Sequence, residues 1–237
     1  MEPTILVGSY PTGPTTYGTM RNQRLTIDDR IEPGKFLLVE NNPKSLWFEA
    51  TYTIASYRLR SGGSVVYDVF ALKLDDVRSG LTKLGVDVNE VEYETRMLRT
   101  YDWHKYIPGI RFSQVEEYYR SLEGMPTAEL IIGDDYSSLA RTLSQDEFEA
   151  FILDILMPPA STRESTIIAG VTRGGRVTEQ MLKDFEPRPD GIIEITIRKG
   201  ETNIRMARMS IPHDSHPHPL KKRSSKVVFA EAELSED

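Results

Sequence analysis

The sequence feature that most constrains the fold is a regular alternation of short apolar runs with amphipathic stretches, which begins at Phe36. Apolar runs rich in β-branched residues are typical of buried strands, and apolar residues three and four positions apart are typical of helices. Strands are predicted at 36–39, 65–70, 93–101, 128–132, 166–171, 191–197, 203–209 and 226–230. Helices are predicted at 44–59, 75–84, 113–122 and 145–156.

This order of elements predicts an α/β fold in three layers, with a central, mostly parallel sheet between helices. The strand at 203–209 follows the strand at 191–197 after a Lys199-Gly200 turn, so antiparallel strands are expected at the C-terminal end of the sheet. Three regions are expected along the chain. They are an irregular lead-in over residues 1–30 with one short strand at 4–7, a main domain over residues 31–220, and a C-terminal strand with an acidic tail over residues 221–237.

Composition excludes several classes of protein. Of the 237 residues, 39% are hydrophobic and 27% are charged, which is close to the globular average and sufficient for a buried core. The formal net charge of -7 does not favour nucleic acid as a partner. The chain has no cysteine, hence no disulfide or thiolate chemistry. It shows no long apolar run and no signal-peptide pattern, so we expect no membrane contact and a cytoplasmic location.

Four segments, in this order and spacing, resemble the KaiC-like branch of the RecA ATPase superfamily, which is common in archaea. Residues 63–87 resemble the second strand and the following helix of that family, and residues 130–139 resemble its Walker B strand with the segment behind it. Residues 188–193 resemble its "ADGVI" strand, and 212–214 with 218–220 resemble its histidine-containing ending. The resemblance covers about residues 31–220 and implies a RecA-like P-loop NTPase fold.

The segment at the position of the family's phosphate loop departs from that pattern. A phosphate loop needs glycines that let backbone N–H groups face the phosphates, a lysine for their charge, and a hydroxyl for Mg²⁺. Here the chain reads Glu40-Asn41-Asn42-Pro43-Lys44-Ser45-Leu46-Trp47-Phe48. Trp47 stands at the lysine position and Phe48 at the hydroxyl position, and no glycine is present. Each lost charge-assisted contact costs roughly 1.5–3 kcal/mol, so nucleotide binding is expected to be weak.

The acid–base groups are missing as well. The resemblance implies paired glutamates after the second strand, where this chain has Ala71 and Leu72. It also implies a basic residue that reaches a neighbouring subunit, for which only Arg208 is a candidate. Asp134 remains at the Walker B position. We therefore predict a pseudo-ATPase, not an enzyme, that has a regulatory or assembly role and binds itself or an active RecA/KaiC-like paralogue.

Two alternatives remain open at this point. The first is a nucleotide sensor without efficient hydrolysis, which would bind ATP and Mg²⁺ through Lys44, Asp134 and the amides of Asn41 and Asn42. Lys44, Ser45 and Asp134 are the candidate remnants of a nucleotide site. Otherwise no cofactor is expected. The second is an accessory protein of DNA recombination or repair, suggested by fold analogy alone.

Several other residues suggest chemistry but have simpler explanations. Trp47 and Phe48 fit a base-stacking platform, although helix-spaced aromatic residues are more often core. Asp134 and Asp135 fit either a metal site or turn formation at a strand end. His104 is a lone histidine, for which a surface role is favoured over catalysis.

The two ends of the chain add three more candidates. The set His213, His216 and His218 with Asp214 resembles a metal cluster, but its spacing fits no standard zinc pattern, and no metal is expected. The segment 8–15 has the spacing of a phosphate loop with Pro14 in place of lysine, and a turn is favoured. The basic run 221–223 suggests nucleic acid, but a solvated turn is favoured.

Overall fold

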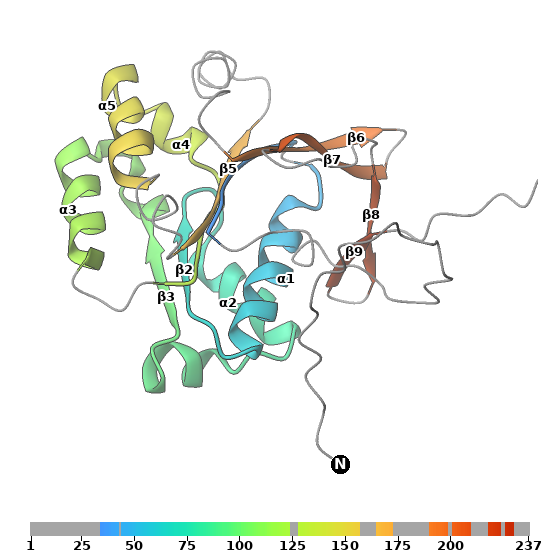
Figure 1. Ribbon diagram of the computed structural model, residues 1–237. Helices are drawn as coiled ribbons and strands as arrows, with labels where there is room; N and C mark the ends of the chain where they lie inside the picture. Colours follow the sequence, from blue (N-terminus) through green and yellow to red (C-terminus); the bar gives the residue numbers. More distant parts are fainter. Residues whose placement is uncertain are drawn as a thin grey trace, which may run out of the picture.

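The computed structural model describes residues 34–42, 44–123, 128–156, 165–172, 190–198, 201–209, 218–223 and 226–229. Over these residues the chain forms one central sheet with helices on both faces (Figure 1). None of the helices in this part of the chain combines the length and apolar character needed to cross a membrane.

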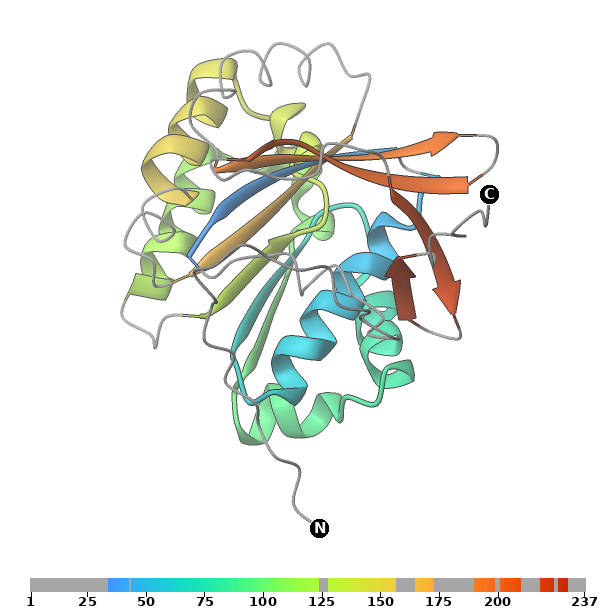
Figure 2. The ribbon, with the colours of Figure 1, turned by 45° about the vertical axis from the view of Figure 1, so that its right-hand side comes forward.

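The sheet begins with six parallel strands. They are β1 (Phe36–Asn41), β2 (Val65–Val69), β3 (Leu98–Asp102), β4 (Leu130–Gly133), β5 (Thr166–Thr172) and β6 (Gly191–Arg198). Three antiparallel pairings then add β7 (Glu201–Met209), β8 (His218–Arg223) and β9 (Lys226–Phe229). The strand order is β3-β2-β4-β5-β1-β6-β7-β8-β9, and Figure 2 shows β8 and β9 turning away from the main sheet beside the first helix.

Each face of the parallel strands carries its own helices. One face is covered by α1 (Trp47–Arg60), α2 (Leu74–Lys83) and the π-helical turn η2 (Glu90–Glu94). The other is covered by α3 (Phe112–Glu123), α4 (Ser137–Ala140), α5 (Gln145–Ala150) and the π-helical segment η5 (Phe151–Leu156). Two short 3₁₀ turns, η3 (Trp103–Lys105) and η4 (Ile107–Gly109), follow β3. Figure 1 shows α1 and α2 on the opposite side of the sheet from α3 and α5.

Strand alternation divides the core into two apolar clusters, one on each face. In β1, Leu37 and Val39 belong to the cluster under α1 and α2, whereas Phe36 and Leu38 belong to the cluster under α3 and α5. Because successive side chains of a strand point to opposite faces, strands that are apolar at every position are buried on both sides. The expected α/β layering, the mostly parallel sheet and its antiparallel C-terminal strands are thus confirmed.

Three predicted elements differ from the structure. The third strand begins at Leu98 and not at 93, because the segment before it is helical: Val91 is buried, and Arg78 holds Glu92 with hydrogen bonds of 3.1 and 3.0 Å. The first helix begins at Trp47 and not at 44. Residues 218–223 form a strand, β8, where only extended and turn-forming chain was expected.

Part of the predicted domain division remains untested. Residues 1–33, with the strand predicted at 4–7 and the loop-like segment 8–15, lie outside the described residues, as does the acidic tail. Strand β8 runs across residue 220, and β9 belongs to the same sheet as β1.

Candidate functional site

The carboxyl ends of the parallel strands lie along one edge of the sheet. The chain leaves β2 toward β3 on one side and leaves β4 toward β5 on the other, although β2 and β4 are neighbours. A reversal of this kind is the topological switch point at which open α/β sheets bind ligands. The topology therefore predicts that the loops after β1, β2 and β4 form the candidate site.

The loop after β1 uses its own backbone amides. The Asn42 N–H donates to the carbonyl of Ile195 at 3.1 Å, and the Ser45 N–H donates to the carbonyl of Asn42 at 2.8 Å. The Lys44 N–H donates to the Asn42 side chain at 2.9 Å, and the Trp47 N–H donates to the Ser45 hydroxyl at 3.3 Å. A phosphate-binding loop directs its amides at the ligand. These amides point instead at acceptors within the protein.

Trp47 is a core residue. Its side chain is only 2% exposed, and its indole Nε1–H donates to the backbone carbonyl of Asp134 at 2.7 Å. The ring reaches this carbonyl because β5 has Gly170 alongside, where a Cβ atom would collide with both groups. The packing interpretation of Trp47 is therefore confirmed, and a base-stacking role is wrong for this ring because it has no exposed face. Phe48 is half-buried and packs against the same apolar cluster.

Asp134 is fully buried, and its carboxylate binds the loop after β2. Oδ1 accepts the N–H groups of Phe70 at 2.7 Å and Ala71 at 3.1 Å, and Oδ2 accepts the N–H of Leu72 at 3.0 Å. Burial raises the pKa of this carboxyl from 3.8 to about 6, while the three amide hydrogen bonds lower it. Asp134, the candidate remnant of a nucleotide site, thus binds a backbone turn, and that turn contains Ala71 and Leu72, where glutamates were sought.

The predicted nucleotide remnants occupy separate environments. Lys44 is exposed, whereas Ser45 is buried and its hydroxyl accepts the Trp47 N–H. In the described part of the chain, no hydrogen bond or ion pair joins Lys44 to Asp134. Their role in nucleotide binding remains a prediction.

Asp135 and the C-terminal histidines were the remaining candidates for a metal site. Asp135 accepts the Ser137 N–H at 3.1 Å and the Thr172 hydroxyl at 3.1 Å, as the turn interpretation expects. Among the residues that the structure describes, no group of three or more histidine and acidic side chains is placed to hold a metal ion. His213 and His216 lie outside these residues, and His218 begins β8.

Sequence reasoning missed Asp68, which lies on the opposite face of β2 from the Trp47 cluster. Its side chain is fully buried. Oδ1 accepts the indole N–H of Trp103 at 3.1 Å, and Oδ2 accepts the hydroxyls of Tyr119 at 2.5 Å and Tyr136 at 3.4 Å. The available signal was a carboxylate inside a strand that is otherwise apolar, because a charged residue is almost never fully buried without a reason.

Burial also raises the pKa of Asp68 from 3.8 to about 6, and hydrogen bonds from Tyr119 and Trp103 partly offset this effect. The surrounding shell is aromatic. Phe70 stacks on Trp103 with ring centroids 5.8 Å apart, and Tyr136 lies 4.7 Å from Phe70. The Tyr136 ring fits against β4 because Gly133 has no Cβ in its path.

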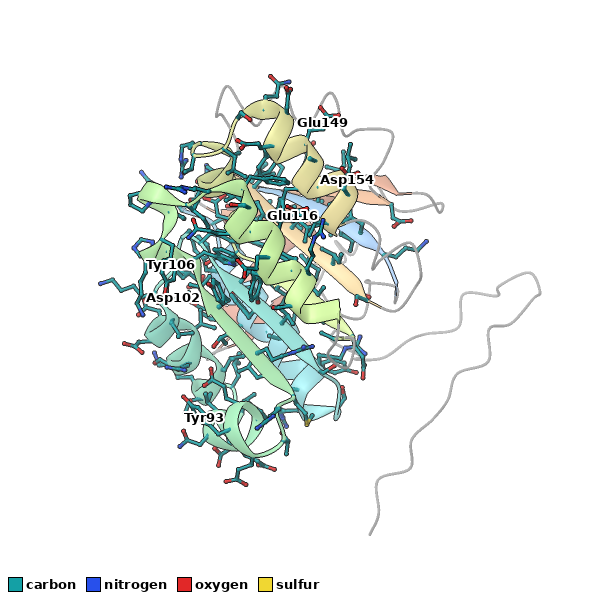
Figure 3. All side chains as sticks on the ribbon, turned by 90° about the vertical axis from the view of Figure 1, so that its left-hand side faces the viewer. Tyr93, Asp102, Tyr106, Glu116, Glu149 and Asp154 are labelled. Atoms are coloured by element: carbon teal, nitrogen blue, oxygen red, sulfur yellow. The ribbon has the colours of Figure 1, made fainter. Side chains whose placement is uncertain are left out.

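The aromatic residues around Asp68 extend to the protein surface at the edge strand β3. Tyr101 lies 4.2 Å from Tyr118 and 6.2 Å from Tyr106, measured between ring centroids, and Tyr106 is 53% exposed. We call Tyr101, Tyr106 and Tyr118 the aromatic rim. Figure 3 looks onto this side of the molecule, with Tyr106 and Asp102 at the edge of the sheet and Glu116 on α3.

A scan against protein-family models finds no match for this chain, and a search of the curated proteins finds none either. The fold and the site together define an α/β protein with helices on both faces of a parallel sheet and two buried carboxylates at the ends of neighbouring strands.

Proposed function

We propose that this protein is a pseudo-ATPase: a RecA/KaiC-like scaffold that has lost ATP turnover and acts in regulation or assembly through contacts with itself or with an active paralogue. One observation carries this proposal. The Asp134 carboxylate is committed to three backbone amides of the β2–α2 loop, and the Trp47 indole is bonded to the carbonyl of the same residue.

The energetic argument follows from these contacts. Recruiting Asp134 to Mg²⁺ would take it away from the amides of Phe70, Ala71 and Leu72. The Phe70 amide is buried, and a buried amide left without an acceptor costs roughly 1–3 kcal/mol. A loss of roughly 3 kcal/mol already weakens binding by more than a hundredfold.

The architecture supports the scaffold part of the proposal. Six parallel strands between two helical layers are consistent with a RecA-like layout. The framework thus fits this layout, whereas Asp134 and Trp47 are bonded within the protein. A protein of this kind retains the surfaces of a RecA-type subunit without the chemistry, which favours a role in protein–protein contacts.

The test is a calorimetric titration of the purified chain with ATP and Mg²⁺, with the mass followed by light scattering. We expect no binding heat up to millimolar ATP and a mass that ATP does not change. Lys44→Ala is the matched variant, because Lys44 is exposed and its removal leaves the core intact. Micromolar binding that Lys44→Ala abolishes would contradict the proposal and favour the nucleotide sensor.

A further inference from the structure

The carboxyl group of Asp68 is held by uncharged side chains. Its hydrogen-bond donors are the Trp103 indole and the hydroxyls of Tyr119 and Tyr136. A buried carboxylate without a cationic partner is costly in its ionised form, and such groups respond by binding a proton. The ligand that these surroundings favour for Asp68 is therefore a proton.

The hydroxyl groups around Asp68 suit both protonation states. A tyrosine hydroxyl can donate or accept, and those of Tyr119 and Tyr136 also lie 3.1 Å from each other. When Oδ2 carries a proton, a neighbouring hydroxyl can rotate and accept it, while the Trp103 N–H still finds an acceptor in Oδ1. The backbone amides around Asp134 can only donate, so they favour the ionised form of that carboxyl.

Trp103 connects Asp68 to the aromatic rim. Its ring centroid lies 4.3 Å from that of Tyr101 and 5.0 Å from that of Tyr118. Its backbone carbonyl accepts the N–H of Tyr106 at 2.8 Å. A change in the hydrogen bond at the indole therefore reaches the rim through direct contacts.

We propose that Asp68 is a reversible proton-binding site whose protonation is transmitted through Trp103 to the aromatic rim. The pKa of about 6 supports this assignment, because it places the titration in a physiologically accessible range. Other ionisable groups surround the site on every packed element. They are Arg99 and Tyr101 on β3, His104 on η3, Tyr118 and Tyr119 on α3, and Asp134 and Tyr136 after β4.

The experiment uses the two tryptophans of the chain: Trp103 is bonded to the Asp68 carboxylate, and Trp47 is bonded to the backbone carbonyl of Asp134. The full chain is labelled with fluorotryptophan, and its two fluorine NMR resonances are followed against pH and assigned with Trp103→Phe. We expect the Trp103 resonance to move with a midpoint near pH 6. Asp68→Asn keeps an acceptor for the indole but binds no proton, so it should abolish that midpoint.

His104→Gln is the matched control, because the His104 ring contacts the carbonyl of Phe70 beside the site. The midpoint should survive in this variant. A midpoint that persists in Asp68→Asn, or that disappears in His104→Gln, would overturn the assignment. If Asp68→Asn does not fold, the pH dependence of the carboxyl carbon resonance of Asp68 in the unmodified chain tests the assignment instead. An Asp68 carboxyl that stays ionised down to about pH 4, the ordinary range, would also overturn it.

Discussion

Asp68 and Asp134 are the same residue type at the ends of neighbouring strands, yet the fold uses them differently. Both are fully buried, and burial raises the pKa of each to about 6. The backbone joins them directly, because the Asp134 N–H donates to the Asp68 carbonyl at 3.2 Å. Asp134 binds three consecutive amides of one loop, whereas Asp68 binds side chains from three separate places in the chain.

The difference shows that the partners of a buried carboxylate determine its role more than its depth does. Obligate donors around Asp134 make it a structural clamp for the loop after β2. Reversible hydroxyl donors around Asp68 leave its protonation state free to change. The clamp lies beside Trp47, whereas the second carboxylate lies beside Trp103 among the aromatic residues on the other face of the sheet.

The largest expected effect is on the clamp side. Trp47→Ala should lower the free energy of unfolding by about 3–5 kcal/mol, because it removes a fully packed indole and its hydrogen bond. Denaturant unfolding measures this value. Phe48→Ala is the control from the same helix and should cost less, since Phe48 is only half-buried. Equal losses in the two variants would show that Trp47 is not the element closing the cleft.

The next effect concerns pH and Asp68. Because its folded pKa lies above the unfolded value of 3.8, the native state binds the proton more tightly than the unfolded state. The resulting stabilisation is complete below about pH 4 and is lost as the pH rises through about 6. It amounts to about 3 kcal/mol. Unfolding curves across this range should show that Asp68→Asn lacks this contribution, and identical pH profiles would contradict it.

A third variant separates the two carboxylates at neutral pH. Asp134→Asn places an amide donor against backbone donors and should cost about 1–3 kcal/mol, because one N–H loses its acceptor. Asp68→Asn should cost less at the same pH, since the hydroxyls of Tyr119 and Tyr136 can accept the new amide N–H, whereas backbone amides cannot. Chemical denaturation of both variants side by side measures the difference. The reverse order would mean that the contrast between clamp and proton site is mistaken.

The close approach of Trp47 to β5 gives a fourth prediction. Gly170→Ala should destabilise by about 1–3 kcal/mol, because the added Cβ would collide with the Asp134 carbonyl and the indole. Gly109→Ala is the matched control, since a Cβ there meets no atom within 4 Å. Thermal unfolding of the pair measures the effect. Similar melting temperatures would show that the strand has room for the methyl group.

The smallest effect is expected at Lys44. This side chain is exposed, so Lys44→Ala should change the free energy of unfolding by no more than about 0.5 kcal/mol. The same unfolding assay measures it. A larger loss would indicate that the loop after β1 depends on the lysine itself and not on the amide bonds of Asn42 and Ser45.

Much of the fold was predictable because local patterns determine it. Apolar periodicity located the parallel strands and the main helices, and Gly85 with its φ of 82° ends α2 as expected of a glycine. The segment before β3 was not predictable, because Val91 and Tyr93 have strand propensity. Tertiary contacts overrule this preference: Val91 is buried in a helical turn, and Glu92 binds Arg78.

The site was predictable only where it depends on neighbours in sequence. The absence of a glycine-rich loop is visible in the sequence, and Trp47 was expected to be a core residue because aromatic residues at helical spacing usually are. The hydrogen-bond donors to Asp68 could not be predicted, because Trp103, Tyr119 and Tyr136 follow it in the sequence by 35, 51 and 68 positions. Nothing in a single sequence pairs one buried aspartate with side chains so far along the chain.

The most direct test of the closed cleft is an ATP and Mg²⁺ titration followed by the fluorine resonance of Trp47, whose indole lies against Asp134. We predict that this resonance stays in place up to millimolar ATP, because the indole is bonded to the backbone carbonyl of Asp134 and the carboxylate of the same residue is bonded to the β2–α2 loop. A saturable shift at micromolar ATP, lost in Lys44→Ala, would show that the cleft opens for nucleotide and would contradict the proposed function.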